Sequence, residues 1–351
     1  MVKIVPVIIF VLLFFYLLIQ SSCELWPDDG EEGYTVIDSV QIYMMDITGK
    51  NLMRITDGEN PVYVPDTNKI LYRLYDKIYT ISMNGTDKQF VANADGLDMN
   101  MFYKMTSSYD GAYVAFPARE KGVYDIFIAT LDGETVLNLT NSDDRWEDNP
   151  IFSADGNSLF FCEFVYISST VHQVKSIGIS SIDLLGNRYK NIIQDSTGFE
   201  LIGITSDNKT VFARKYDSSK GTDLYIINND NPFDYKKVFF QNDNCRFSST
   251  ISDDNILYFN KNESGIYSFN LTTEEIILIY DGPVERDYVL SNNIEKLLKN
   301  SDRSGLEIID LNTGESITVL SEWDADLRDL SFSPDDRQVM FVKAVHIETY
   351  K

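Results

Sequence analysis

The sequence predicts an all-β fold made of repeated four-stranded sheets, and three observations support this prediction. A short turn motif recurs along the 351 residues at intervals of 39 to 52 residues. The runs that flank these turns are rich in Ile, Val, Tyr and Phe, which favour strands. No segment shows a sustained helical period with capping residues. Since 44% of the residues are hydrophobic, the chain also has enough apolar material for a core.

The turn motif is the best marker of the repeat. Typical copies read SYDG, SADG and SPDD, and one copy has Asn in place of the Asp. Asp-Gly and Asn-Gly pairs supply the positive φ angles that tight hairpins need, and an Asp side chain can accept hydrogen bonds from nearby backbone amides. We therefore predict a structural role for this residue in every copy. The predicted turn residues are Asp66, Asp110, Asp155, Asp207, Asp254, Asn293 and Asp335.

Each repeat unit contains about four strands. The unit from Asp125 to Phe161 reads as a strand, an Asp-Gly turn, a strand ending in Leu-Thr, a polar loop with Asn-Pro, and a second hairpin. A four-stranded sheet cannot bury both faces alone, but sheets stacked radially bury them against one another and leave only short edges. The sequence therefore predicts a single β-propeller. Seven turns indicate seven blades, with six and eight as the alternatives.

The two ends of the chain are expected to complete one blade together. The chain begins its repeats with the outer pair of strands of a unit, residues 42–56, and finishes with an inner pair, residues 330–342. Pairing of these N- and C-terminal strands closes the ring and removes two open sheet edges, which otherwise invite aggregation.

The N-terminus has the features of a secretory signal. Lys3 precedes the apolar stretch Ile4–Ile19, and small residues follow before Cys23. This pattern resembles the bacterial lipoprotein signal, in which the Cys becomes the lipidated first residue of the mature chain. We predict a signal over residues 1–22, an acidic tether over residues 23–37 and the propeller over residues 38–351. An ordinary cleaved signal and an uncleaved anchor are the alternatives.

The repeat resembles the TolB-type, PD-motif repeat, a WD-repeat-like unit of bacterial envelope propellers. The residues that carry the resemblance are Asp125, Asp132, Gly133, Leu139, Thr140, Pro150, Phe152, Ser153, Asp155 and Gly156. The resemblance extends over about residues 40–343 and implies the fold, whereas such propellers serve many functions. TolB itself places an α/β domain before a propeller that normally has six blades, so we do not carry over its role in the Tol system.

Composition argues against several classes of function. A formal charge of -24 disfavours nucleic acid, because a phosphate backbone needs clustered Lys and Arg. The two histidines, His172 and His346, are too few for a multi-histidine metal site. Hydrolases of the prolyl-oligopeptidase type also use such propellers, but they need a G-x-S-x-G turn, which the sequence lacks. We therefore predict no catalytic residue, no metal and no cofactor.

The two cysteines beyond the N-terminus are predicted to have no functional role. Cys162 is predicted to be buried in an inner strand and Cys245 to lie in a loop, and a disulfide between them is disfavoured. Oxygen-rich loops at residues 93–98 and 217–223 are interpreted as turns, although calcium binding by such a loop stays open.

One end of the propeller channel is the candidate binding region. Positions seven residues before the turn residue are expected to surround this end. The candidate residues are Glu59, Asp148, Glu200, Arg286 and Arg328. Three acids and two bases suit a polar ligand, and a solvated rim with internal ion pairs is the alternative interpretation.

The sequence favours a non-enzymatic binding platform outside the cytoplasm, attached by its lipid to a bacterial membrane in the periplasm or on the cell surface. Its expected partner is a protein, peptide or glycan of the envelope. A hydrolase or lyase with a site at the channel mouth is one alternative, and an accessory subunit of an envelope or secretion assembly is another. The identity of the partner, the membrane and the oligomeric state stay open.

The lipid attachment can be tested by metabolic labelling with a fatty-acid analogue. We expect the label to mark the wild-type chain and to be absent from Cys23→Ala, because the thiol of Cys23 is the predicted acceptor. Equal labelling of the two chains contradicts this prediction.

Overall fold

The computed structural model describes residues 34–93, 104–120, 123–168, 173–194, 198–217, 221–231, 233–241, 243–251, 256–284, 288–301, 305–321 and 326–350. Every regular element within these ranges is a β-strand. None of the described residues forms a helix that is long and apolar enough to span a membrane. The predicted signal, Cys23 and most of the predicted tether lie outside the described residues.

The chain divides into two compact units. Residues 39–345 form the propeller, and residues 1–38 with 346–351 form a second, small unit. Within the small unit the structure describes residues 34–38 and 346–350, which are the first residues of β1 and the last residues of β28.

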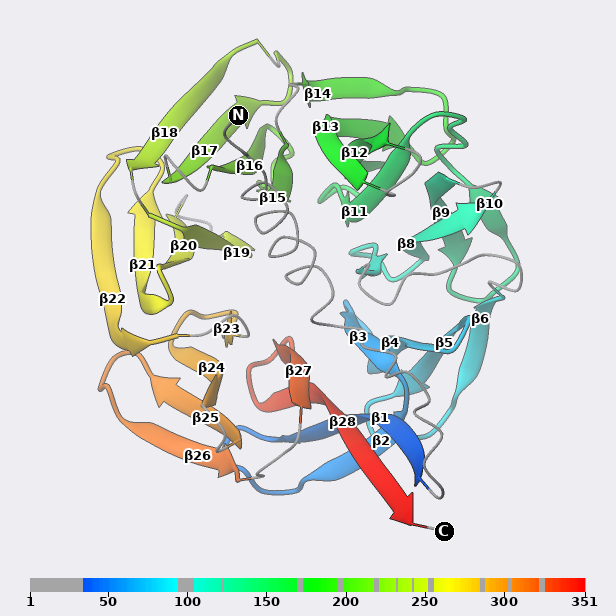
Figure 1. Ribbon diagram of the computed structural model, residues 1–351, viewed down its shortest axis with the longest axis vertical. Helices are drawn as coiled ribbons and strands as arrows, with labels where there is room; N and C mark the ends of the chain where they lie inside the picture. Colours follow the sequence, from blue (N-terminus) through cyan, green and yellow to red (C-terminus); the bar gives the residue numbers. More distant parts are fainter. Residues whose placement is uncertain are drawn as a thin grey trace, which may run out of the picture. The chain divides into compact units, whose positions relative to one another are not determined.

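Seven four-stranded sheets form the blades of a ring, which confirms the predicted fold and the predicted number of blades (Figure 1). From the centre of the ring outward, blade 1 contains β27 (Asp326–Phe332), β28 (Gln338–Tyr350), β1 (Tyr34–Asp46) and β2 (Met53–Asp57). In the same direction, blade 2 contains β3 (Glu59–Val64), β4 (Lys69–Leu74), β5 (Lys77–Ser82) and β6 (Gln89–Asn93). Blade 3 contains β7 (Thr106–Ser107), β8 (Tyr113–Glu120), β9 (Val123–Thr130) and β10 (Val136–Asn138).

The remaining blades follow in chain order, and their strands also run from the centre outward. Blade 4 contains β11 (Trp146–Phe152), β12 (Ser158–Ser168), β13 (Gln173–Asp183) and β14 (Lys190–Gln194). Blade 5 contains β15 (Glu200–Ile204), β16 (Thr210–Asp217), β17 (Gly221–Asn228) and β18 (Tyr235–Gln241). Blade 6 contains β19 (Cys245–Ile251), β20 (Ile256–Lys261), β21 (Ser264–Asn270) and β22 (Ile276–Pro283). Blade 7 contains β23 (Tyr288–Leu290), β24 (Lys296–Ser301), β25 (Gly305–Asp310) and β26 (Ser316–Leu320).

The core consists of seven hydrophobic clusters of described residues, one in each space between neighbouring blades. Strand β4 shows how a sheet serves two clusters. Its Leu71 packs between blades 2 and 3, whereas Ile70 and Tyr72 pack on the opposite face, between blades 1 and 2. Successive strand residues point to opposite faces, so a strand buried on both sides is a nearly continuous apolar run. Full burial of one such side chain contributes about 1.5–3 kcal/mol.

The recurrent turn is held by a side-chain motif that begins two residues before the turn residue. A Ser or Thr hydroxyl at that position donates to the turn residue at 2.6–2.8 Å and accepts the backbone N–H five residues further on at 2.9–3.0 Å. The hydroxyl residues are Ser108, Ser153, Thr205, Ser291 and Ser333. The same hydroxyl is the main cause of a lowered pKa in Asp110, Asp155, Asp207 and Asp335.

Three turn residues need separate description. Asn293 makes the same bonds as its Asp counterparts through its amide oxygen. Asp66 lies two residues after Val64, which has no hydroxyl, and adopts a left-handed φ of 54°. Thr67 donates to the carbonyl of Val64 at this turn. Asp254 lies outside the described residues.

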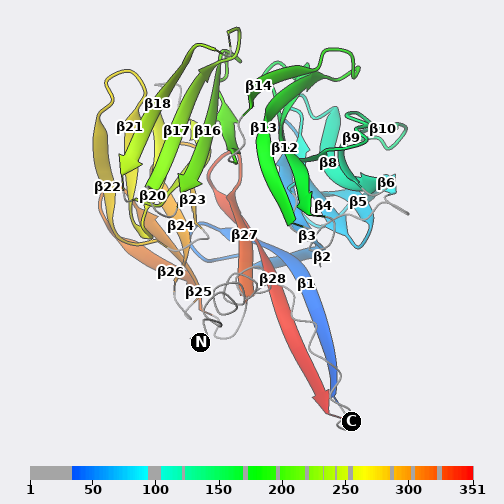
Figure 2. The same ribbon diagram turned by 45° about the horizontal axis from the view of Figure 1, so that its top comes forward.

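The ring closes as predicted, because β1 and β28 are neighbours in one sheet (Figures 1 and 2). Blade 1 therefore takes its inner strands from one end of the chain and its outer strands from the other. Hydrogen bonds also join blade 1 to its neighbour blade 7: the carboxylate of Asp336 accepts the backbone N–H groups of Asn292 and Asn293 at 2.8 and 2.9 Å.

Truncation tests the contribution of this closure. A chain that ends at Asp324 lacks β27 and β28, which supply side chains such as Phe341 and Met340 to the clusters on both faces of blade 1. We expect the melting temperature of the whole propeller to fall sharply, measured by far-ultraviolet circular dichroism. A chain that ends at Val345 retains the whole 39–345 unit and serves as the control. An unchanged melting temperature in the shorter chain contradicts closure as the stabilising feature.

Candidate functional site

Bulges mark several innermost strands near the end at which they begin. The strand register shifts just after Glu59 in β3, after Asp148 in β11 and after Arg328 in β27. The next residue in each strand has a left-handed φ of 52–55°; these residues are Asn60, Asn149 and Asp329. Asn and Asp tolerate this conformation better than most residues, and a bulge re-aims the neighbouring side chains.

The structure brings together two of the residues predicted at the channel mouth. The guanidinium of Arg328 lies 3.7 Å from the carboxylate of Glu59, since blades 1 and 2 are neighbours in the ring. Arg73 of β4, whose exposed fraction is 4%, donates to the other oxygen of the same carboxylate. The result is an internal ion-pair network of two guanidinium groups around one carboxylate.

The other predicted mouth residues have separate partners. Glu200 pairs with Arg214 of β16 at 2.5 Å. Asp148 accepts the backbone N–H of Asn149 at 2.5 Å. Burial raises the pKa of Asp148 to about 7, although the Asn149 N–H and the positive charge of Lys104 act in the opposite direction. Arg286 lies outside the described residues.

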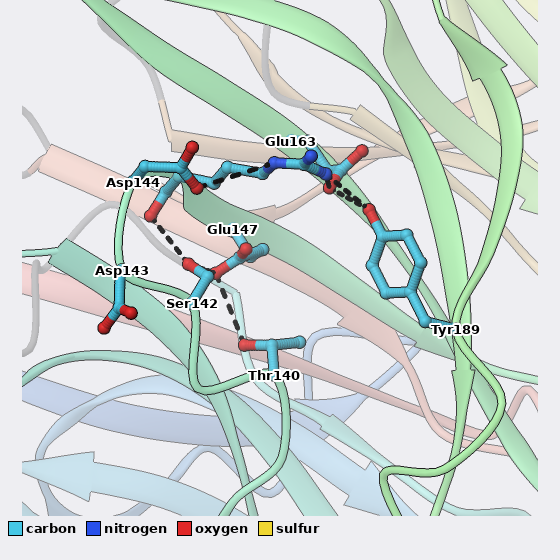
Figure 3. Close-up of a pocket in the computed structure, with 8 residues that line it drawn as sticks. Thr140, Ser142, Asp143, Asp144, Glu147, Glu163 and Tyr189 are labelled. Atoms are coloured by element: carbon cyan, nitrogen blue, oxygen red, sulfur yellow. Dashed lines mark hydrogen bonds and ion pairs between the residues drawn. The ribbon is translucent and has the colours of Figure 1, made fainter.

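A polar pocket of about 490 Å³ lies beside the loop that links β10 to β11 (Figure 3). No residue of this pocket was predicted as a binding residue. Its lining residues are Thr140, Ser142, Asp143, Asp144, Arg145, Glu147, Glu163 and Tyr189. The loop supplies the first five, blade 4 supplies the two glutamates from paired positions of β11 and β12, and Tyr189 comes from the residue before β14.

Both carboxylate oxygens of Glu163 accept hydrogen bonds in this pocket. Its exposed fraction is 0%, and its carboxylate accepts hydrogen bonds from Arg145 at 2.7 Å, from Ser180 at 2.8 Å and from the hydroxyl of Tyr189. Arg145 also donates to the Tyr189 oxygen at 2.9 Å. A buried carboxylate with a guanidinium and two hydroxyl donors is a stable arrangement, because its charge and its lone pairs are both compensated.

Glu147 has a different environment, although it lies directly opposite Glu163 in the β11–β12 pair. Its exposed fraction is 1%, and it accepts hydrogen bonds from Ser142 at 3.1 Å and Thr140 at 3.3 Å. Burial raises the pKa of Glu147 to about 8. The Ser142 hydroxyl opposes this shift, and the neighbouring carboxylate of Asp125 adds to it through its charge and by hydrogen bonding to the protonated form.

Asp125 completes the cluster from blade 3. It is 2% exposed and accepts hydrogen bonds from the Ser142 N–H at 2.8 Å and from Asn138 at 2.7 Å. These bonds fix the pocket loop against β9. The resemblance had singled out Asp125 and Thr140 as repeat residues, but it gave no indication that the two lie beside a pocket.

The two glutamates face each other because of the bulge in β11. Near the turn Phe152 pairs with Leu159, a register that by itself would place Glu147 opposite Phe164. The register shift after Asp148 moves the pairing by one residue and brings Glu147 opposite Glu163. Two acids on the two strands of one hairpin are visible in the sequence, but only the structure shows that they meet and that Asp125 joins them.

The cysteine predictions had mixed outcomes. Cys162 is buried in β12, as predicted, and its thiol is free. The prediction for Cys245 was wrong: it is the buried first residue of β19, and its N–H donates to the hydroxyl of Thr222. Burial raises the pKa of both thiols to about 12, so both are protonated at neutral pH.

Other predictions fall largely outside the described residues. His172 lies there, as do residues 94–98 of the first oxygen-rich loop and residues 218–220 of the second. Within the part of the chain that the structure describes, no three or more His, Cys, Asp or Glu residues are arranged to hold a metal ion.

Comparisons with known proteins support the fold. No family model and no curated protein matches the sequence. Among solved structures, an oligogalacturonate lyase in complex with manganese has a TM-score of 0.68 at 15% identity, covering 91% of this chain and 98% of that one. An oligogalacturonate lyase from Vibrio parahaemolyticus has a TM-score of 0.67 at 14% identity, covering 89% and 98%. At these identities the likeness shows a common propeller fold alone.

A TolB-like structure also matches over a similar length. A putative TolB from Agrobacterium tumefaciens has a TM-score of 0.48 at 14% identity, covering 89% of this chain and 100% of that one. The seven blades themselves confirm the propeller that the TolB-type repeat implies. The two lyase structures agree with this fold.

Glu147 makes the stability of the propeller depend on pH. Its pKa rises from an ordinary value of 4.5 to about 8 in the folded state, so between these values the folded protein binds a proton that the unfolded chain has released. The free energy of unfolding therefore falls as the pH rises through this window, by up to about 1.4 kcal/mol per pH unit. Asp148, with a pKa raised to about 7, acts in the same direction.

We expect Glu147→Gln to remove part of this slope, since an amide does not titrate but still accepts from Ser142 and donates toward Asp125. Urea denaturation at pH 6, 7 and 8 measures the slope. Glu315→Gln, at an exposed turn of blade 7, is the matched control and should keep the wild-type slope. Equal slopes in Glu147→Gln and the wild type contradict the raised pKa.

Proposed function

We propose that this chain is an extracytoplasmic binding platform for a protein, peptide or glycan partner in a bacterial envelope, attached to the membrane through a lipid on Cys23. One observation carries the proposal: the pocket of about 490 Å³ is lined by polar and charged side chains whose positions are fixed by hydrogen bonds. Its volume lies in the range typical of ligand sites, about 300–1,000 Å³.

The fold supports this role because hydrogen bonds hold the pocket loop against blades 3 and 4. Glu147 and Glu163 lie on paired strands of blade 4, and the loop is bound to blade 3 through Asp125. Functional residues held by regular elements keep a more constant geometry than residues on free loops. A partner would therefore meet donors and acceptors that are already in place, which reduces the entropy lost on binding.

Site-specific photo-crosslinking in the native envelope tests the platform. A photoreactive amino acid placed at Asp143, an exposed residue of the pocket rim, should capture a reproducible partner that mass spectrometry identifies. The same amino acid at Glu315, exposed on blade 7, is the matched control and should not capture that partner. Capture of no partner at Asp143, or equal capture at both positions, contradicts the proposal.

A further inference from the structure

The pocket carries more buried negative charge than its own cation compensates. Glu147, Glu163 and Asp125 are each at least 98% buried, being exposed by 1%, 0% and 2%. Among the described residues that line the pocket, Arg145 is the one cation, and it bonds to Glu163. Asp143 and Asp144 at the rim add two further acidic groups, of which Asp144 lies 3.8 Å from the guanidinium of the same Arg145.

The excess charge concentrates on Glu147 and Asp125, which interact with each other and share hydrogen bonds from the hydroxyl groups of Thr140 and Ser142. Two ionised carboxylates buried side by side repel each other even when hydroxyl and amide groups donate to them, so a proton or a cation stabilises such a pair. Burial, together with the neighbouring carboxylate of Asp125, raises the pKa of Glu147 to about 8, which favours the protonated form of Glu147 at neutral pH. A cation that reaches the pocket can take the place of this proton.

We propose that the pocket binds an organic cation, the guanidinium or ammonium group of a basic side chain, and that Glu147 is the carboxylate that receives it. This inference rests on the proposed platform and names the chemistry that its pocket recognises. Entry of the cation ionises Glu147, and the proton goes to solvent. The bound cation then lies between Glu147 and the acids of the rim.

The chain itself shows that the pocket suits a guanidinium. Arg145 already meets Glu163 at 2.7 Å and the Tyr189 oxygen at 2.9 Å, which is the geometry of a strong charge-assisted hydrogen bond. Glu147 lies at the paired position on the adjacent strand. A volume of about 490 Å³ is also much more than one ion needs, since a water molecule occupies about 30 Å³.

A protein partner is the source that the charge of the chain favours. The formal charge of -24 attracts basic surfaces at long range and speeds their encounter. We therefore expect the cation to arrive on a Lys or Arg side chain of a peptide rather than as a free amine. Both sources share the same charged group, so the experiment must separate them.

Isothermal titration of the full chain, purified from membranes in detergent, provides the test. The probes are acetyl-Ala-Arg-Ala-amide, the same peptide with neutral citrulline in place of Arg, and free agmatine. We expect the Arg peptide to bind at least about tenfold more tightly than the citrulline peptide, because a hydrogen bond to a charged group is lost. Tighter binding of the peptide than of agmatine identifies the peptide as the source, and the reverse order overturns the expected source.

Variants assign the binding to the pocket. Glu147→Gln should lower the affinity for the Arg peptide by about tenfold or more. Glu315→Gln, which changes the net charge equally, should leave this affinity unchanged. Equal affinities for the Arg and citrulline peptides, or an unaffected Glu147→Gln, overturn the proposal. Calcium is a further test. If millimolar calcium displaces the Arg peptide from the wild type and Glu147→Gln no longer binds calcium, the pocket is a metal site and the proposal is overturned.

A pH series provides a second readout that a structural role for Glu147 would not move. The charged and titratable groups around Glu147 are Asp125 on β9, Glu163 on β12, Asp143, Asp144 and Arg145 on the loop, and Tyr189 before β14. We expect affinity for the Arg peptide to rise about tenfold from pH 6 to pH 7 and to level off above pH 8, with proton release on binding. A flat profile in the wild type overturns the proposal.

The two proposals fail in different ways. If photo-crosslinking at Asp143 captures a partner while the Arg and citrulline peptides bind equally, the platform stands and the cation pocket is wrong. If no partner is captured although the Arg peptide binds through Glu147, the pocket chemistry stands and the proposed platform is wrong.

Discussion

Each sheet of this protein has two apolar faces, and the whole structure depends on burying both. Tyr72 and Leu71, adjacent in β4, pack in different clusters because they point toward different neighbouring blades. A linear stack of such sheets would always expose the outer faces of its first and last members. A ring removes these two faces, since the last sheet packs against the first, and β1 beside β28 completes the sheet at which the ring closes.

The fold could be predicted from the sequence because its signals are local. The turn motif needs only the few residues between Ser153 and Ser158, whose hydroxyl and backbone groups bond to each other and to Asp155. The motif therefore survives in copies whose strands have diverged, and its substituted member, Asn293, keeps the same bonds. Cys245 was misplaced because the polar segment before it resembles a loop, whereas the strand begins at the cysteine itself.

The pocket could be predicted only in part, because its parts come from two blades. The hairpin around Asp155 is legible in the sequence, but Glu147 lies opposite Glu163 only because the bulge after Asp148 shifts the strand register by one residue. The approach of Asp125 depends instead on the packing of blade 3 against blade 4, which no local pattern encodes. The same limit applies to the residues predicted at the channel mouth, because Glu59 and Arg328 meet only where the ring brings blade 2 beside the C-terminal strand β27 of blade 1.

The shared construction of blade 1 also sets the order in which the protein acquires its structure. A ribosome makes β1 and β2 before the six complete blades and β27 and β28 after them, so the hairpin of β1 and β2 waits with an unpaired edge throughout synthesis of those blades. Pairings between distant parts of a chain form slowly, and exposed strand edges are prone to aggregate while they wait. A factor that shields this hairpin during synthesis therefore has a defined target in the nascent chain.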